Sequence, residues 1–241
     1  MTRISEAELE RLFVQAHSSF ILEDQFFAKL IDSTVYVHVP VSDDYQHVRF
    51  MQFRHPDGFD AIPFFTSALR SEKARSKAIR TLRLSCVDLF QVTRGATLMV
   101  NPNDGGAVIY PEEVASLLDG RAIETFEKVS LSNGPVDIRL AQAPPPALLE
   151  TLRTGAALTP FIKDVYVLEQ RAVQGSTQES TLLVYLGVAA IHMDRGARHI
   201  VSLIQQMSPR LNDIIDVAAF DADLKRPEFL DELQAEPVYR A

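Results

Sequence analysis

The sequence has one cysteine and no tryptophan, and it contains no long apolar run. A single cysteine cannot form an intramolecular disulfide, so the chain is not a disulfide-stabilised secreted scaffold and a reducing compartment is expected. The longest nearly apolar stretch, residues 181–193, falls short of the ~20 residues that a membrane-spanning helix needs. The first residues are charged where a secretory signal would be apolar. We therefore expect a soluble cytoplasmic protein. Export by a specialised secretion system, which needs no such signal, stays an alternative.

Motifs of common catalytic and nucleotide-binding sites are also missing. The sequence has no GxSxG nucleophile turn, no P-loop lysine and no GxGxxG fingerprint. Cys86 has apolar neighbours, which suit a packed thiol better than a nucleophile. His38, His47 and His55 lie near neighbouring predicted strands but lack the spacing of a zinc site. The sequence thus favours a non-enzyme and predicts no catalytic residues, no metal site and no cofactor.

What the chain does contain is typical of two ordinary globular domains. Its 241 residues are 46% hydrophobic and 23% charged, enough for two separate cores. The formal charge is −8, from 24 basic and 32 acidic residues, and a nucleic-acid partner is therefore not expected. We predict an α+β fold of two sequential domains, residues 1–128 and 129–241. Each should hold a mostly antiparallel sheet packed against helices.

In the first half, helical and alternating patterns follow one another. Ser5 and Glu8 have the spacing of a capping box, and helical apolar positions follow them. Valines at every second position of residues 35–41 predict a strand with one buried face. Turn residues between apolar runs predict hairpins over residues 48–65 and 96–110.

Prolines mark several of the predicted boundaries. Pro63 cannot donate a ladder hydrogen bond, so we expect it at a sheet edge or a bulge. Thr66 or Ser67 should then cap the next helix. The run of residues 144–146 is either an interdomain linker or, as the following leucines favour, the entry to a helix over residues 147–153.

The second half is predicted to hold strands around one strongly amphipathic helix. Residues 165–171 and 181–190 read as strands, the second apolar on both faces as in a central strand. An apolar stripe over residues 200–211 predicts a helix, and residues 214–220 return as a strand. Residues 221–241 are predicted to be loosely structured.

The most specific surface feature is the basic window of residues 70–83, which carries six basic residues against one acid. On a helix, four of them would lie in one stripe: Arg70, Lys73, Lys77 and Arg80. Such a stripe is either a solvated helix face or a docking surface for an acidic protein, a phosphate-bearing ligand or RNA backbone. The tail, residues 221–236, carries six acids against two basic residues and would either fold back on the stripe or face a partner.

Two sets of short motifs occur along the chain. The first half contains Ile62-Pro63-Phe64-Phe65-Thr66-Ser67, Leu98-Met99-Val100-Asn101-Pro102 and Tyr110-Pro111-Glu112-Glu113-Val114. The second half contains Pro146-Ala147-Leu148-Leu149-Glu150-Thr151-Leu152, Val165-Tyr166-Val167-Leu168, Leu182-Leu183-Val184-Tyr185-Leu186-Gly187 and Pro237-Val238-Tyr239. In combination and order they resemble the SseB, or enhanced serine sensitivity, family. The resemblance implies a cytoplasmic bacterial protein with N-terminal and C-terminal SseB domains, in a family without an established catalytic activity.

Three functions are compatible with these observations. The first is a non-catalytic interaction or regulatory protein whose basic stripe binds an unidentified protein partner, with self-association as a further option. The second is a sensor of a small molecule such as an amino acid or a nucleotide, bound between the two domains. The third is an antitoxin-like or effector-binding protein that presents its acidic surface to a basic target. We favour the first, because the sequence shows no convergent catalytic set.

Overall fold

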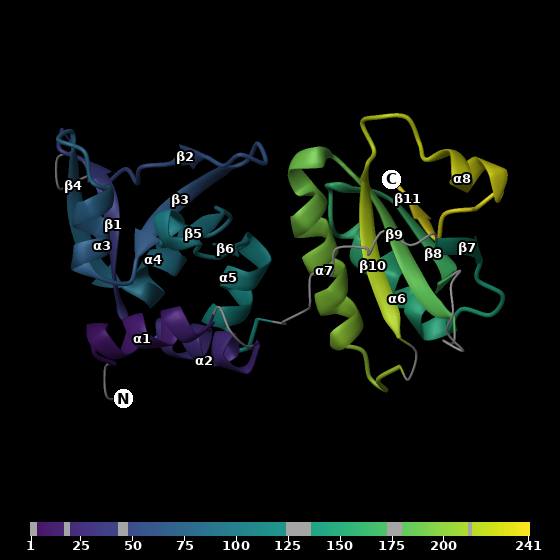
Figure 1. The fold of residues 1–241 in the computed structure, drawn as a ribbon, viewed down its shortest axis with the longest axis horizontal. Helices are drawn as coiled ribbons and strands as arrows, with labels where there is room; N and C mark the ends of the chain where they lie inside the picture. The colour runs from purple at the N-terminus through teal and green to yellow at the C-terminus, as the bar shows by residue number, and fades with distance from the viewer. Residues whose placement is uncertain (1–3, 17–19, 43–47, 124–135, 173–179, 212–213) are drawn as a thin grey trace. The chain divides into compact units, whose positions relative to one another are not determined.

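The computed structural model describes residues 4–16, 20–42, 48–123, 136–172, 180–211 and 214–241. The chain divides into two compact units, Met1–Thr125 and Phe126–Ala241 (Figure 1). Each unit combines helices with its own mixed sheet, which confirms the predicted α+β fold class. The predicted boundary at residue 128 lies outside the described residues.

In its described residues, the first unit packs five α-helices against a mixed sheet. The strands are β1 (Thr34–Pro40), β2 (Phe53–Arg54), β3 (Asp60–Phe65), β4 (Ile79–Ser85), β5 (Leu98–Val100) and β6 (Val108–Ile109). The helices are α1 (Glu6–Ala16), α2 (Phe20–Leu30), α3 (Ala68–Ala74), α4 (Cys86–Val92) and α5 (Pro111–Leu118), with a 3-10 turn η1 (Pro102–Asp104). The sheet order is β4-β1-β3-β5-β6, with β2 beside β3. β3 and β5 are parallel, and the other neighbours are antiparallel.

Local sequence accounts for several of these elements. The Ser5 hydroxyl accepts the Glu8 amide at 3.2 Å, as its position before α1 predicts. The alternating Val35, Val37 and Val39 of β1 are fully buried on one face of the sheet. Val35 and Val37 belong to the core that α1, α2, α4 and α5 share. The predicted hairpins are present as the β2–β3 and β5–β6 pairs.

Pro63 lies inside the sheet, so the predicted edge or bulge position is wrong. Its strand, β3, has β5 on one side and both β1 and β2 on the other. The Ile62 amide donates to Thr97 on the β5 side, so the nitrogen of Pro63 faces the opposite side. There β2 pairs with β3 only up to Ala61, and β1 pairs only from Phe64. The proline therefore occupies a gap between two partners and removes no ladder hydrogen bond.

The predicted helix across the basic window is also wrong beyond Ala74. α3 ends at that residue, and β4 begins at Ile79 and pairs with β1 along its whole length. The alternation of residues 80–84 explains the strand, because Leu82 and Leu84 pack against the buried valines of β1. A continued helix would have left the edge of β1 unpaired.

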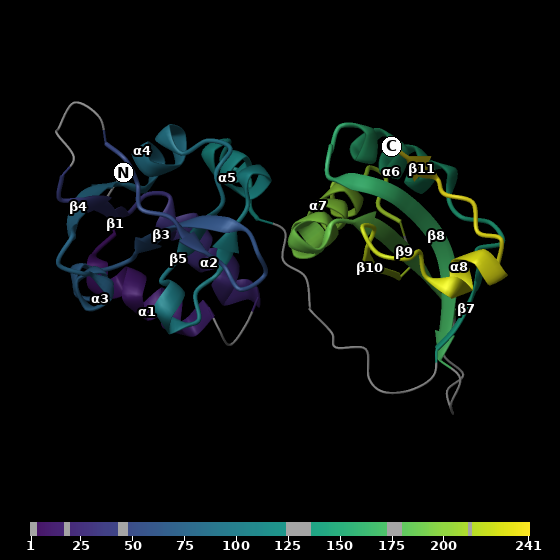
Figure 2. The same ribbon diagram turned by 90° about the horizontal axis from the view of Figure 1, so that it is seen from above.

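In the part of the second unit that the structure describes, three α-helices pack against a second mixed sheet. The strands are β7 (Val136–Leu140), β8 (Ile162–Ala172), β9 (Thr181–Val188), β10 (Ile215–Asp221) and β11 (Tyr239–Arg240). The helices are α6 (Pro146–Ala157), α7 (Met193–Gln205) and α8 (Glu228–Glu232), with a 3-10 turn η2 (Ala190–His192). The sheet order is β10-β9-β8-β11, with β7 also paired to β8, which curves along the sheet (Figure 2). β10 runs parallel to β9, and the other pairs are antiparallel.

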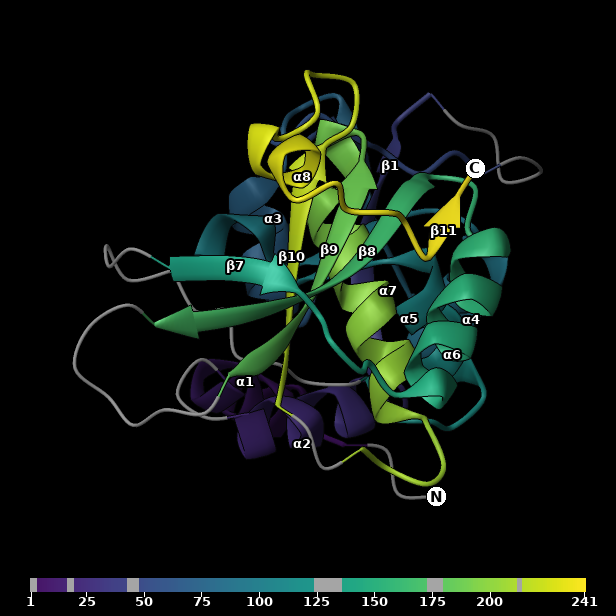
Figure 3. The ribbon, with the colours of Figure 1, turned by 90° about the vertical axis from the view of Figure 1, so that its right-hand side faces the viewer.

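Both faces of this sheet are covered. Leu148 and Leu152 of α6 and Ile200 of α7 form a core with one face, and α6 begins at Pro146 as the leucine pattern predicted. α8 lies on the opposite face (Figure 3). Its Leu230 packs there with Tyr166 and Phe220.

The tail is ordered, so the predicted loose structure of residues 221–241 is wrong. α8 lies within it, and β11 adds to the edge of β8 with Tyr239 opposite Val165. The Arg226 guanidinium lies 5.3 Å from the Tyr166 ring centroid and donates to the Ala235 carbonyl. These contacts are with distant residues, and short-range patterns do not encode them.

Candidate functional site

The four residues of the predicted basic stripe do not share a helix face. Arg70 and Lys73 lie on α3, Lys77 lies in the turn that follows it, and Arg80 lies on β4. Arg80 is half-buried on the core side of the sheet, opposite Val39. Lys73 and Lys77 remain exposed. The stripe therefore separates into an inward part and an outward part.

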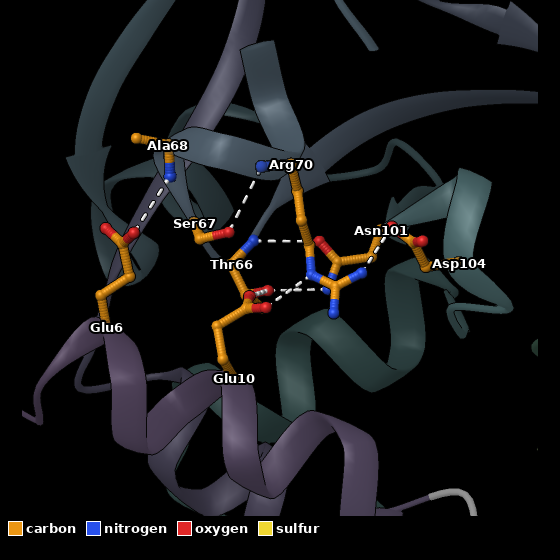
Figure 4. A network of polar contacts seen from close by, with 8 residues as sticks. All are labelled: Glu6, Glu10, Thr66, Ser67, Ala68, Arg70, Asn101 and Asp104. Carbon is orange, nitrogen blue, oxygen red and sulfur yellow. Dashed lines mark hydrogen bonds and ion pairs between the residues drawn. The ribbon is translucent and has the colours of Figure 1, made fainter. Parts of the chain in front are cut away.

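Arg70 belongs to the inward part and is held by acids (Figure 4). Its Nε lies 2.7 Å from the Glu10 carboxylate of α1, and its Nη1 lies 2.5 Å from the Asp104 carboxylate of η1. Its guanidinium carbon is 4.9 Å from the Phe13 ring centroid. Desolvation disfavours the charge, but the bonds to Glu10 and Asp104 outweigh it and raise the pKa of Arg70. Arg70 thus links α1 and η1 to α3, and its guanidinium group binds acids of its own unit.

Two fully buried side chains extend this network at the ends of the parallel strands β3 and β5. The Asn101 amide oxygen accepts the Thr66 backbone amide at 3.0 Å, and the Asn101 amide nitrogen donates to the Thr66 hydroxyl at 2.7 Å. The Thr66 hydroxyl donates in turn to the Glu10 carboxylate. Asn101 has a φ of 44°, a left-handed conformation that asparagine tolerates better than most residues. Ser67 caps α3 by accepting the Arg70 amide at 3.4 Å.

Glu6 joins the same cluster from the first turn of α1. One carboxylate oxygen accepts the Ala68 amide at 3.3 Å, and the other accepts the Tyr36 hydroxyl at 2.7 Å. We call these residues the polar cluster: Glu6, Glu10, Thr66, Arg70, Asn101 and Asp104. Sequence reasoning selected Arg70 as a surface residue and missed its partners, although two of the short motifs end at Thr66-Ser67 and at Asn101-Pro102.

The segment that holds this cluster matches a known family. Residues 9–116 match the SseB protein N-terminal domain. The first unit therefore contains an SseB N-terminal domain. The match spans most of the polar cluster, from Glu10 to Asp104. It ends before the second unit, where the predicted C-terminal SseB domain is not matched. No curated protein and no solved structure shows a significant match to this SseB protein.

The outward part of the basic window lies along β4, the edge strand of the SseB domain. In the β1–β4 ladder, Val41 donates to Ala78 and Cys86 donates to Ser33, so even-numbered residues of β4 bond to β1. The backbone groups of Thr81 and Arg83 consequently point away from the sheet, and they have no partner among the described residues.

Exposed cations border this stretch of backbone. The Ser71 and Thr81 hydroxyls are 2.8 Å apart, which places α3 over the face of β4 that also carries Arg83. Arg83 and the exposed Lys73 and Lys77 therefore lie on elements that meet there. We call Lys73, Lys77, Thr81 and Arg83 the basic edge. Arg75 pairs with Glu72 at 2.9 Å. It also donates to the Ile79 carbonyl, so this backbone group at the start of β4 already has a partner.

The other candidate groups have structural roles. Cys86 is fully buried, as predicted for a packed thiol, and burial raises its pKa well above the usual value. His38 lies 3.1 Å from both the carbonyl and the hydroxyl of Ser71. Among the described residues, no three metal-binding side chains converge, and no helix could cross a membrane. His47 lies outside the described residues.

Acids of the tail bind bases of their own unit. Asp223 is 2.5 Å from Lys163, Asp231 is 2.8 Å from Arg226, and Glu228 is 2.6 Å from Lys225. That the tail folds back on the basic stripe, or instead faces a partner, stays a prediction.

Proposed function

We propose that this SseB protein is a non-catalytic interaction module whose basic edge binds an extended acidic segment of a partner protein. The main support for this proposal is the backbone of Thr81 and Arg83, which points away from the sheet. It is bordered by the cations Lys73, Lys77 and Arg83. An added strand obtains affinity from backbone hydrogen bonds and specificity from its alternate side chains. Acidic side chains on that strand would meet the cations, and basic strands would be repelled.

The polar cluster indicates a structural role for the short sequence motifs that end at Thr66-Ser67 and at Asn101-Pro102. Its Thr66 and Asn101 side chains bond to each other, and its carboxylates bond to Arg70, to backbone amides and to Tyr36. Side chains satisfied in this way rigidify a fold. We therefore assign the polar cluster a structural role in the fold around β4. Partner recognition is assigned to the exposed basic edge. A reducing bacterial cytoplasm is part of this proposal, because the chain's one cysteine is a buried free thiol.

A peptide titration tests the proposal. The probe is a fluorescent peptide of alternating glutamate and valine, with an alternating glutamine and valine peptide as its neutral match. We expect that only the acidic peptide binds. Its affinity should fall as salt rises from 0.05 to 0.5 M, because the Debye screening length shortens to ~3–5 Å.

Charge reversal at one position then assigns the surface. Arg83→Glu should weaken binding about tenfold, since an exposed ion pair contributes ~0.2–1 kcal/mol and reversal adds a repulsion of similar size. Arg94→Glu, at an exposed arginine beyond α4, is the matched control and should bind as wild type. Equal affinity of Arg83→Glu and wild type, or equal binding of the neutral peptide, would refute the proposal.

A further inference from the structure

The second unit presents a different kind of edge at β10. β10 borders only β9 among the described strands, and it lies at one side of the sheet (Figure 1). Leu182 donates to Ile214 and Ala222 donates to Val188, so even-numbered residues of this segment bond to β9. The backbone groups of Ile215, Val217 and Ala219 therefore point outward. They have no partner among the described residues.

Two aspartates, Asp216 and Asp221, are the only charged residues of this edge, and it carries no other usual protection against strand pairing. Residues 215–221 contain no proline, lysine or arginine, which are the residues that most often block an edge. The Asp216 carboxylate turns inward, where it accepts the Thr181 hydroxyl at 3.1 Å and the Gln170 amide. The Asp221 carboxylate accepts the Asp223 amide at 3.0 Å. The three central residues with outward backbone groups, Ile215, Val217 and Ala219, are apolar, in contrast to β4 with its arginines.

The sequence of β10 is suited to pairing with itself. In an antiparallel pair with a two-fold axis at Val217, Ile215 lies opposite the partner's Ala219 and Val217 lies opposite the partner's Val217. Each such pair exchanges two hydrogen bonds and satisfies the outward groups. Asp216 then lies opposite the partner's Ala218. Asp221 and Asp213, which this register would bring opposite each other, lie beyond the paired residues 214–220. A basic edge such as β4 would place arginines of two copies close together, which is unfavourable.

The same register explains an exposed apolar residue. Ile214, just before β10, is 69% exposed. In the two-fold pair it lies opposite the partner's Phe220. Its side chain would be buried there, because both side chains lie on the same face of the joined sheet. Isologous pairing of this kind closes after two copies and forms a discrete dimer.

We propose that two copies of this chain join through β10 in an antiparallel pair, so that the two sheets of the second units become one continuous sheet. This proposal rests on β10 alone and is independent of the basic edge. Its partner is a second copy of the chain.

Sedimentation equilibrium of the full chain over 1–200 μM tests the proposal, together with hydrogen exchange measured by NMR. We expect a dimer whose Ile215, Val217 and Ala219 amides exchange slowly. Ile214→Lys changes an exposed side chain and should raise the dimer dissociation constant at least tenfold. Leu140→Lys, at a 48% exposed leucine of β7 in the same sheet, is the matched control and should dimerise as wild type.

A second variant acts on the backbone. Val217→Pro removes one outward amide without touching a bond to β9, and it should yield a monomer. The Leu182 amide reports whether β9 and β10 remain paired. A chain that stays monomeric at 200 μM would refute the proposal. So would a dimer in which the three outward amides exchange freely, or one that Ile214→Lys leaves unchanged.

Discussion

The polar cluster makes a quantitative prediction at Asn101. Asn101→Ala removes both bonds to Thr66 and leaves the buried Thr66 amide unpaired, which costs ~1–3 kcal/mol. It also places alanine at a φ of 44°, which costs a further ~1–2 kcal/mol. We therefore expect the free energy of unfolding of the first unit to fall by roughly 2–5 kcal/mol. Asn101→Gly tolerates the positive φ and should show only the hydrogen-bond part.

The assay uses the one thiol of the chain. Cys86 is fully buried in the first unit, so its labelling across a urea titration follows unfolding of this unit alone. With a slope of ~2 kcal/mol per M, Asn101→Ala should lower the midpoint by about 1–2.5 M. Asn103→Ala, at an exposed position in η1, is the control and should stay near wild type. A midpoint for Asn101→Ala that matches this control would refute the assigned role of the amide.

Two further predictions concern pH and close packing. Burial lowers the pKa of His38, so the unfolded chain binds a proton at this histidine more readily than the folded chain does. The stability that the neutral, buried His38 contributes is therefore present above about pH 6.5, the usual pKa of histidine in unfolded chains, and is lost as pH falls. Urea midpoints at pH 7.5 and 5.5 should therefore differ more for wild type than for His38→Gln, and equal differences would contradict the burial argument. An alanine Cβ at Gly106 would lie 1.5 Å from the Val100 carbonyl oxygen, whereas at Gly95 it would meet no atom within 4 Å. Gly95→Ala should then cost ~1–2 kcal/mol for its φ of 85°, and Gly106→Ala should cost at least twice as much in the same urea assay; similar costs would count against the hairpin geometry.

Elements with strong local signals could be predicted from the sequence. The alternating valines of β1, the Ser67 cap of α3 and the proline at the start of α5 each specify their structure within a few residues. The α+β class and the SseB resemblance of the first half followed from the order of such signals.

The missed features depend on distant partners. The basic charges of residues 70–83 masked the alternation that makes β4 a strand, and pairing with β1 decides the outcome. The partners of Arg70 lie 60 residues earlier, at Glu10, and on η1, so no local pattern indicates an ion pair. β11 has only two residues, and its strand conformation depends on β8.

The shared edge of β8 has a consequence for the order of folding. β7 pairs with residues 168–172 of β8, and β11 pairs with Asp164 and Val165 farther along the same edge. Tyr239 and Val165 are 74 positions apart, since 239 − 165 = 74, whereas Ile215 and Leu182 of the β10–β9 pair are 33 apart, since 215 − 182 = 33. Closing the longer loop costs about 0.7 kcal/mol more in chain entropy. Because β11 is too short to offset this cost early, we expect it to dock last. Until it docks, Asp164 and Val165 form an additional open edge of the sheet.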